Sequence, residues 1–297
     1  MSINLHGYKV VVLGGDERET ETLRLLKEHG ADIEAFGTPA SAEKALGREQ
    51  ASSLNQAVAG ANILLCPIPL PEMDGSLYAP HFEGKIYLNP GTLSELAPGA
   101  VIITGVASTG MREAAEKLGL FLREYERDED LMILRSASIA EGAISTAIQN
   151  SLVSIHQSNV IIVGFGRIGL ALGHLLIGMR ARAFTATPLP IEQARAYEVG
   201  LTVYPLEQLG EVVGKMDIIF NTIPITVFDR NMLERVSPDT LLIDIVAPPG
   251  GVDRVAAVEL GTRFIWARGL GRFGPRTVAK SQWLGIERIL RDIHPEL

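Results

Sequence analysis

The sequence predicts an α/β protein of two domains, each built on a doubly wound, mostly parallel sheet. Its length of 297 residues is natural for two domains of ordinary size. Its composition, 46% hydrophobic and 21% charged, is that of a globular protein. Apolar, β-rich runs alternate with amphipathic stretches along most of the chain, which is the pattern of parallel strands covered by helices.

In the first half, the glycine pair Gly14-Gly15 turns a buried strand into a helix that ends at His29-Gly30. This pair lacks the third glycine of a nucleotide loop, and Asp16 would put a carboxylate where a phosphate should lie. We therefore interpret Asp16 as the helix N-cap. The elements expected here are strands at Tyr8–Leu13, Ile33–Phe36, Ala61–Cys66 and Val101–Thr104, and a helix at Glu17–Glu28.

The boundary between the two halves lies near residues 130–155. Glu124–Asp130 holds five acids in seven residues, which is typical of a solvated surface loop. Ser138–Ile155 predicts a long helix crossing from one half to the other. The expected division is an N-terminal flavodoxin-like or substrate domain (1–135), a connecting helix (136–155) and a second domain (156–277), with the C-terminal helix (278–297, about Lys280–Asp292) completing the first domain by analogy with two-domain dehydrogenases.

The second half carries a phosphate-loop motif, Gly164-Phe165-Gly166-Arg167-Ile168-Gly169. The motif follows directly on a β-branched run and opens a helix, so its context is the strand, tight turn and helix N-terminus that bind a pyrophosphate. A structural turn without a ligand is the alternative. The motif predicts a Rossmann dinucleotide-binding domain with strands at Asn159–Val163, Ala181–Ala186, Asp217–Asn221, Leu241–Val246 and Phe264–Ala267.

The end of the second strand of this domain bears on the choice between NAD and NADP. An NAD site usually has an acid about 20 residues after the first glycine. This chain has Thr185 and Thr187 there, and no acid before Glu192. Missing negative charge and nearby hydroxyls favour NADP over NAD, although no arginine stands at the strand end either.

The loop after the third strand of this domain is expected to complete the cofactor site. It reads Asn221-Thr222-Ile223-Pro224. In folds of this kind the loop lies beside the cofactor ribose and nicotinamide. An ordinary strand-ending turn is the alternative for each of these residues.

Composition argues against several other classes of protein. The net charge of −8 and the absence of a basic stripe argue against a nucleic-acid partner. Cys66 is the only cysteine, so neither a disulfide framework nor a cysteine metal site can form, and no histidines and carboxylates stand at metal-ligand spacing. No signal-like segment and no run of about 18 apolar residues is found. We expect a cytoplasmic protein with no membrane and no metal.

The positions of the histidines argue against a 2-hydroxy-acid dehydrogenase, which needs a histidine as acid and base, because no histidine stands where it could face the nicotinamide. Arginines and hydroxyls at two segments instead suggest a site for an acidic small molecule that is oxidised or reduced by hydride transfer. The expected substrate-binding residues are Arg135, Ser136, Ser138, Arg268 and Arg272, and the candidate catalytic residues are Glu141, Ser138 and Lys280, with Glu141 expected to be a buried carboxylate.

Several segments together resemble the A subunits of dipicolinate synthase from endospore-forming bacteria. The resemblance runs over most of the chain and is densest in the second half. It is carried by Val11–Asp16, Ala140–Ile144, His156–Gly169, Asp217–Pro224 and Pro249–Asp253. The chain departs from the family pattern at Arg135–Ile139, where the family reads Asn-Ser-Ile-Pro-Thr, and at 270–276, where arginines replace other residues.

The resemblance implies oxidation of dihydrodipicolinate to dipicolinate, with NADP+ as the hydride acceptor. It also implies a partner, the flavoprotein-like B subunit of the enzyme, and a place in the mother-cell cytoplasm during sporulation. Two alternatives stay open: another NADP-linked dehydrogenase of a carboxylate substrate, and a non-catalytic nucleotide-binding component. Homo-oligomer formation also stays open.

Overall fold

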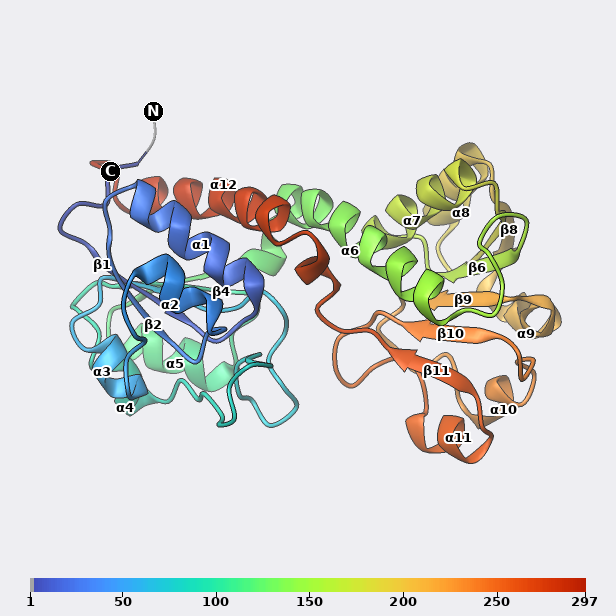
Figure 1. The fold of residues 1–297 in the computed structure, drawn as a ribbon, viewed down its shortest axis with the longest axis horizontal. Coiled ribbons are helices and arrows are strands. Elements are labelled where there is room, and N and C mark those ends of the chain that lie inside the picture. Colours follow the sequence, from blue (N-terminus) through green and yellow to red (C-terminus); the bar gives the residue numbers. More distant parts are fainter. Residues whose placement is uncertain (1–2) are drawn as a thin grey trace. The chain divides into compact units, whose positions relative to one another are not determined.

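The computed structural model describes residues 3–297 and divides into two compact units. Unit 1 comprises Met1–Leu134 and Gly274–Leu297, and unit 2 comprises Arg135–Phe273. The C-terminal helix α12 (Pro275–Ile293) therefore belongs to the N-terminal unit, where it packs beside α1 (Glu17–Glu28) (Figure 1). The Nε atom of Arg276 on α12 lies 3.6 Å from Oε2 of Glu21 on α1.

Unit 1 contains a five-stranded parallel sheet in the order β2-β1-β3-β4-β5. This is the flavodoxin-like order of a doubly wound sheet. The strands are β1 Lys9–Leu13, β2 Asp32–Phe36, β3 Ile63–Leu65, β4 Val101–Thr104 and β5 Phe121–Glu124. The remaining helices are α2 Ser41–Leu46, α3 Leu54–Val58, α4 Pro90–Leu93, α5 Thr109–Lys117 and the 3-10 turn η1 Tyr125–Arg127.

Unit 2 contains a six-stranded parallel sheet in the order β11-β10-β9-β6-β7-β8, the Rossmann arrangement. The strands are β6 Asn159–Val163, β7 Arg182–Thr187, β8 Thr202–Pro205, β9 Ile218–Asn221, β10 Leu241–Asp244 and β11 Arg263–Trp266. The helices are α7 Arg167–Gly178, α8 Pro190–Val199, α9 Leu209–Val212, α10 Arg230–Leu233 and α11 Arg254–Glu259, with 3-10 turns η2 Leu206–Gln208, η3 Val213–Lys215 and η4 Leu270–Phe273.

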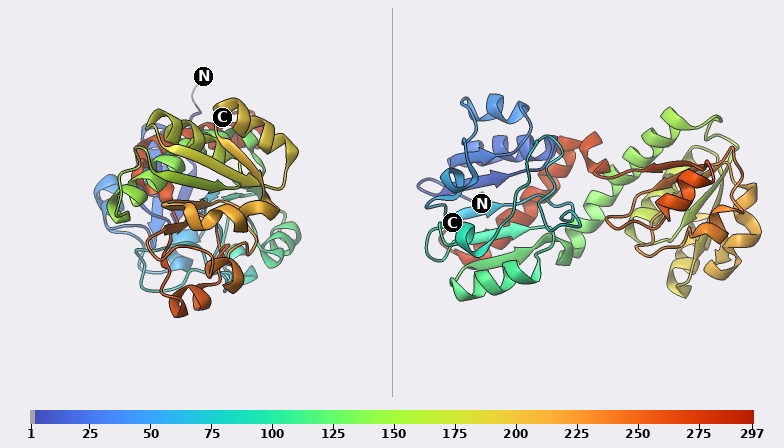
Figure 2. Two further views of the ribbon diagram at one scale, coloured as in Figure 1. Left: turned by 90° about the vertical axis from the view of Figure 1, so that its right-hand side faces the viewer. Right: turned by 90° about the horizontal axis from the view of Figure 1, so that it is seen from below.

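Helices cover both faces of each sheet, which Figure 2 shows for unit 2 in its left view. Alternate residues of a strand point to opposite faces. In β6, Val160 and Ile162 pack with α6 and α7, whereas Ile161 and Val163 pack with α9 and α11. In unit 1, Val10 and Val12 likewise join one apolar cluster while Val11 and Leu13 join another. The predicted two-domain, doubly wound fold is thus confirmed.

The helix α6, which crosses from one unit to the other, spans Glu129–Asn150. The predicted range, Ser138–Ile155, was therefore wrong at both ends: it began too late and ended too late. The acidic stretch read as a loop forms the end of β5, the turn η1 and the first turn of α6. Glu129 and Asp130 in that first turn are favoured by the helix dipole. By length and composition α6 could cross a membrane, yet half of its apolar window is buried, as in a core helix.

Candidate dinucleotide-binding site

The loop between β6 and α7 has the geometry that a pyrophosphate needs. Gly164 has a φ of +89°, in the left-handed region that favours glycine. Gly166 is the N-cap of α7 and provides no capping side chain. A Cβ on Gly169 would lie 2.5 Å from the carbonyl oxygen of Gly164, so only glycine lets helix and strand pack this closely. The uncapped helix N-terminus leaves N–H groups for an anion.

A hollow of about 340 Å³ opens beside this loop. It lies at the carboxyl ends of β6 and β9, the neighbouring strands at which the strand order reverses and where such sheets bind ligands. Its volume falls in the range of small-molecule sites, roughly 300–1,000 Å³. It is lined by Gly164, Gly166, Arg167, Ile168, Pro188, Leu189, Glu192, Thr222, Ile223 and Pro224.

The structure therefore brings together most of the residues expected to bind the cofactor. Phe165 and Gly169 contribute without lining the hollow. The Phe165 ring is fully buried and packs under Gly173, where a Cβ would come within 2.8 Å of the ring. Residues that could hold a nicotinamide dinucleotide are thus present on the loop, on α7 and after β9.

Three of the predicted cofactor residues take internal roles instead. Thr185 is fully buried and its hydroxyl donates to the carbonyl of Ile162 (2.9 Å), so the expected contact with the cofactor is wrong. The hydroxyl of Thr187, also buried, donates to the carboxylate of Glu192. Asn221 is buried and donates from Nδ2 to Oδ1 of Asp244 (2.9 Å). Thr187 and Asn221 therefore support residues of the site rather than line it.

Glu192 lines the hollow and was missed as a site residue from the sequence. Its Oε2 accepts hydrogen bonds from the backbone N–H of Phe165 (2.9 Å) and from the Thr187 hydroxyl. A sequence signal existed, because Pro190 at the first position of α8 places Glu192 in the first turn of that helix, close to the end of β7.

Asp244, at the end of β10, is a second residue that the sequence reading missed. It is 1% exposed and accepts hydrogen bonds from the backbone N–H groups of Gly251 (2.8 Å) and Val246 (3.2 Å), in addition to Asn221. Burial raises the pKa of its carboxyl, while these hydrogen bonds lower it. Asp244 thereby ties the loop after β9 to the loop after β10.

The expected substrate residues of unit 2 come from α6 and from the segment after β11. These two segments are in close contact, because a Cβ on Gly142 would lie 2.7 Å from the carbonyl oxygen of Leu270. Ser138 is buried on α6, one turn before Gly142 and on the same side of the helix, and Ser136 is buried as well. Arg135 is half-buried.

The guanidinium groups after β11 lie against aromatic rings. That of Arg268 is 5.5 Å from the centre of the Trp266 ring, and Arg272, which is exposed, donates to the carbonyl of Arg268 (3.1 Å). Glu141 is exposed, so the expectation of a buried carboxylate was wrong. Lys280 is exposed on α12 of unit 1.

The first-half glycine loop has a different role. Asp16 caps α1 in a capping box with Glu19, which confirms the N-cap interpretation. The Glu19 side chain fills the space beside Gly15, where a Cβ would come within 2.1 Å of it. Asp16 is fully buried and pairs with Arg18 at 2.7 Å. No room is left at this loop for a phosphate.

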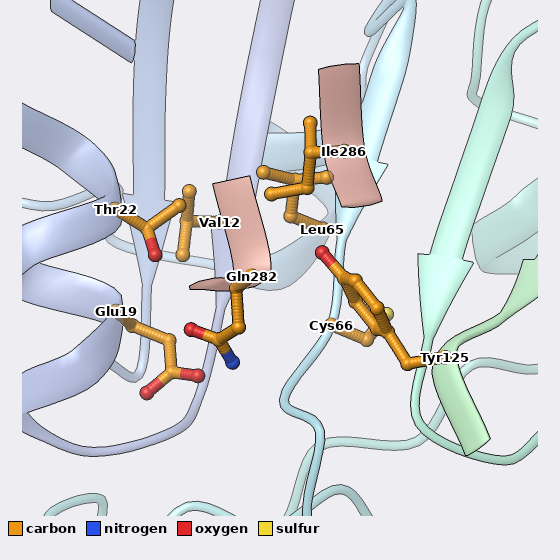
Figure 3. Close-up of a pocket in the computed structure, with 8 residues that line it drawn as sticks. All are labelled: Val12, Glu19, Thr22, Leu65, Cys66, Tyr125, Gln282 and Ile286. Atoms are coloured by element: carbon orange, nitrogen blue, oxygen red, sulfur yellow. The ribbon is translucent and has the colours of Figure 1, made fainter. Parts of the chain in front are cut away.

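A small cavity of about 10 Å³, the size of one water molecule, lies beneath this loop. Figure 3 shows Glu19, Tyr125 and Gln282 directed into it from three different elements. Oε1 of Gln282 is buried without a hydrogen-bond partner. Burial raises the pKa of Glu19 to about 7 and that of Cys66 to about 12. A cavity of this size holds no substrate.

Comparisons with known proteins bear on both units. Residues 9–125 match the family model of the N-terminal domain of the dipicolinate synthase A subunit. Residues 132–245 match the model of the D-isomer specific 2-hydroxyacid dehydrogenase, NAD binding domain. Unit 2 is thus of the nicotinamide dinucleotide-binding type found in oxidoreductases.

Relatives cover the whole chain. The A subunit of dipicolinate synthase from Bacillus subtilis (strain 168) is 28% identical over 294 residues, which are 98% of this chain and 99% of that protein. The crystal structure of the corresponding protein from Bacillus halodurans superposes with a TM-score of 0.81 at 25% identity, covering 97% of this chain and 99% of that one. The crystal structure of the Bacillus subtilis protein gives 0.80 at 26% identity, with 99% of each chain covered. The predicted resemblance is confirmed.

Proposed function

Because the chain is a homologue of the dipicolinate synthase A subunits, we propose that it oxidises dihydrodipicolinate to dipicolinate with a nicotinamide dinucleotide bound at Gly164–Gly169. The observation that carries this proposal is the uncapped N-terminus of α7. It opens on a hollow of about 340 Å³ at the point where the strand order of the sheet reverses. A pyrophosphate fits this geometry.

The proposed oxidation requires no strong general acid or base from the protein. The substrate loses a hydride and a proton, and the ring that remains is aromatic, so the driving force is intrinsic. A dinucleotide held by the loop Gly164–Gly169 would supply the hydride acceptor, and the proton would pass to solvent or to a nearby base. The chain must mainly hold a dicarboxylate in place and keep its reacting carbon oriented.

Arginines and buried hydroxyls suit that task. Arg268 and Arg272 follow β11, and the Gly142 contact holds that segment against α6, which carries Ser138. Guanidinium groups bind carboxylates through paired hydrogen bonds. We assign substrate binding to Arg135, Ser136, Ser138, Arg268 and Arg272. Among the proton-accepting candidates, Glu141 and Lys280 are exposed and Ser138 is buried.

The acceptor and the partner are further parts of the proposal. The expectation of NADP rested on the absence of an acid near Thr187, and the position of Glu192 now argues for NAD instead. Partnership with a flavoprotein-like B subunit, like the mother-cell cytoplasm as location, rests on the family resemblance. A non-catalytic nucleotide-binding role is the second candidate, favoured by the exposure of Glu141 and Lys280.

The test of substrate binding uses arginine variants of the complete chain. Dihydrodipicolinate is generated in situ and offered with NAD+ or NADP+, with and without the B subunit, while dipicolinate formation is followed. Arg135→Ala and Arg268→Ala should raise KM at least about 10-fold while lowering kcat less, because each removes a charged contact to the substrate. Arg123→Ala, an exposed arginine on β5, is the control. An unchanged KM would remove these arginines from the site.

A further inference from the structure

The structure places an unexpected carboxylate, that of Glu192, in the lining of the hollow beside the phosphate loop. Resting on the proposed dinucleotide site, we propose that Glu192 binds the hydroxyls of the adenosine ribose and makes the site select NAD over NADP. The sequence motif does not indicate this, because Glu192 follows the first glycine by more residues than the roughly 20 that are typical. Phe184–Pro188, about 20 residues after that glycine, holds no acid.

Two hydrogen bonds hold the Glu192 carboxylate where a ribose-binding acid belongs. Thr187 is the last residue of β7, the strand next to β6, and its hydroxyl donates to Oε2 of Glu192. The backbone N–H of Phe165, inside the glycine loop, donates to the same oxygen at 2.9 Å. The carboxylate is thereby fixed between the end of the second strand and the phosphate loop. That is the place from which an acid reaches the ribose 2′-hydroxyl in NAD sites.

The second carboxylate oxygen is open to a ligand. Oε1 of Glu192 takes part in no hydrogen bond among the described residues, and Glu192 lines the hollow. The same oxygen lies 3.5 Å from the position that a Cβ on Gly166 would take, so it faces the loop residue that allows close approach of the ligand. A ribose hydroxyl can donate to Oε1 without breaking either existing bond.

The charges around this position disfavour a 2′-phosphate. Arg167 is the one cationic residue lining the hollow within the described residues, and it is the first residue of α7, directly after Gly166 of the phosphate loop. Arg182 lies at the opposite end of β7, where its guanidinium donates to the carbonyl of Gln157 (3.0 and 2.6 Å). Arg195, on α8, does not line the hollow. A 2′-phosphate carrying nearly two negative charges would be repelled by the Glu192 carboxylate, and among the described residues no second cation besides Arg167 lines the hollow to offset that repulsion.

The experiment measures dissociation constants of NAD+ and NADP+ for the complete chain by calorimetry. The unmodified chain should bind NAD+ at least about 10-fold more tightly than NADP+, the scale of one hydrogen bond to a charged group. Glu192→Gln keeps an oxygen for the Phe165 N–H but removes the charge. This variant should bind NAD+ about 10-fold more weakly, and its preference for NAD+ over NADP+ should become smaller or reverse. Glu198→Gln, which removes an exposed charge from the same helix, should leave both constants unchanged.

The outcomes separate this assignment from the proposed function. Tighter binding of NADP+ than of NAD+ by the unmodified chain would overturn the role of Glu192 and leave the dinucleotide site standing. An unchanged ratio of the NAD+ and NADP+ dissociation constants in Glu192→Gln, with thermal denaturation showing that the variant is folded, would also overturn the role of Glu192. Binding of neither dinucleotide by the unmodified chain would overturn the proposed function itself.

Discussion

Nδ2 of Asn221, at the end of β9, donates a hydrogen bond of 2.9 Å to Oδ1 of Asp244, at the end of β10. Both side chains are buried, and Asp244 also accepts the backbone N–H groups of Val246 and Gly251. One carboxylate therefore fixes two loops at the carboxyl edge of the sheet. The first of these loops contributes Thr222, Ile223 and Pro224 to the hollow.

Replacing Asp244 by asparagine should destabilise unit 2 and weaken dinucleotide binding. The amide would point an N–H group at one of the donors that Asp244 now satisfies, and hydrogen bonds to a charged acceptor are lost. The free energy of unfolding should fall by about 1–3 kcal/mol. Urea denaturation and NAD+ calorimetry on the same preparation check this. Asp253→Asn, which alters an N-cap on α11 outside the hollow, is the control. Equal losses in the two variants would contradict a special role for Asp244.

Substitutions at two glycines of the phosphate loop should affect protein stability and dinucleotide affinity differently. A Cβ on Gly166 meets nothing closer than Oε1 of Glu192 at 3.5 Å, so Gly166→Ala should fold; because alanine is a poorer N-cap than glycine, the variant should lose no more than about 1 kcal/mol of stability. The methyl group blocks the approach of the pyrophosphate, so affinity for the dinucleotide should fall at least about 10-fold. Gly169→Val should instead destabilise the protein by about 1–3 kcal/mol or more, because its Cβ meets the Gly164 carbonyl oxygen at 2.5 Å. Thermal denaturation with calorimetry distinguishes the two effects.

The contact between α6 and the segment after β11 should depend on Gly142. An alanine there would press on the backbone oxygen of Leu270 at 2.7 Å and should cost about 1–3 kcal/mol of stability. It should also raise KM for the substrate, because Arg268 and Arg272 flank that contact. Gly178→Ala on α7, where a Cβ meets nothing within 4 Å, should change stability by no more than about 1 kcal/mol. Matching stabilities in the two variants would disprove the close packing.

Stability should depend on pH through Glu19. Burial raises the pKa of this carboxyl to about 7; Arg18 lowers it and Asp16 raises it. The folded protein holds the proton more tightly than the unfolded chain, where the ordinary value is 4.5. The free energy of unfolding should therefore fall as pH rises from about 4.5 to about 7. Glu19→Gln should flatten this part of the profile in urea titrations, and Glu116→Gln, an exposed control, should not. A slope that survives in Glu19→Gln would rule out Glu19 as its source.

The fold could be predicted from the sequence because its central strands are continuous apolar runs between glycine turns. Two of the four edge strands, β5 and β8, could not be predicted in this way, whereas the edge strands β2 and β11 were. β5 is half-exposed and ends in an acidic stretch, and β8 is half-exposed and followed by a 3-10 turn. The start of α6 was placed too late because Glu129 and Asp130 were read as solvated charge, although acids are also favoured in the first turn of a helix.

The phosphate loop could be predicted because its spacing and its context agree. The partners of side chains could not, since hydrogen bonds across the fold are not encoded in local spacing. The hydroxyl of Thr185 donates to the carbonyl of Ile162 and that of Thr187 donates to Glu192. Both hydroxyls expected to bind a 2′-phosphate therefore make hydrogen bonds within the protein instead. The end of β7 carries no acid, as expected, but the carboxylate of Glu192 from α8 lies beside it.

A single-turnover measurement with the protein in excess over dihydrodipicolinate tests the central claim most directly. Reduced nicotinamide and dipicolinate are quantified together, in the presence and in the absence of the B subunit. Both products should appear in equal amounts and at equal rates in the unmodified protein, and Gly166→Ala should form both more slowly at the same subsaturating dinucleotide concentration. Dipicolinate formed without reduced dinucleotide, or no dipicolinate from a protein saturated with dinucleotide, would contradict dinucleotide-dependent oxidation by this chain.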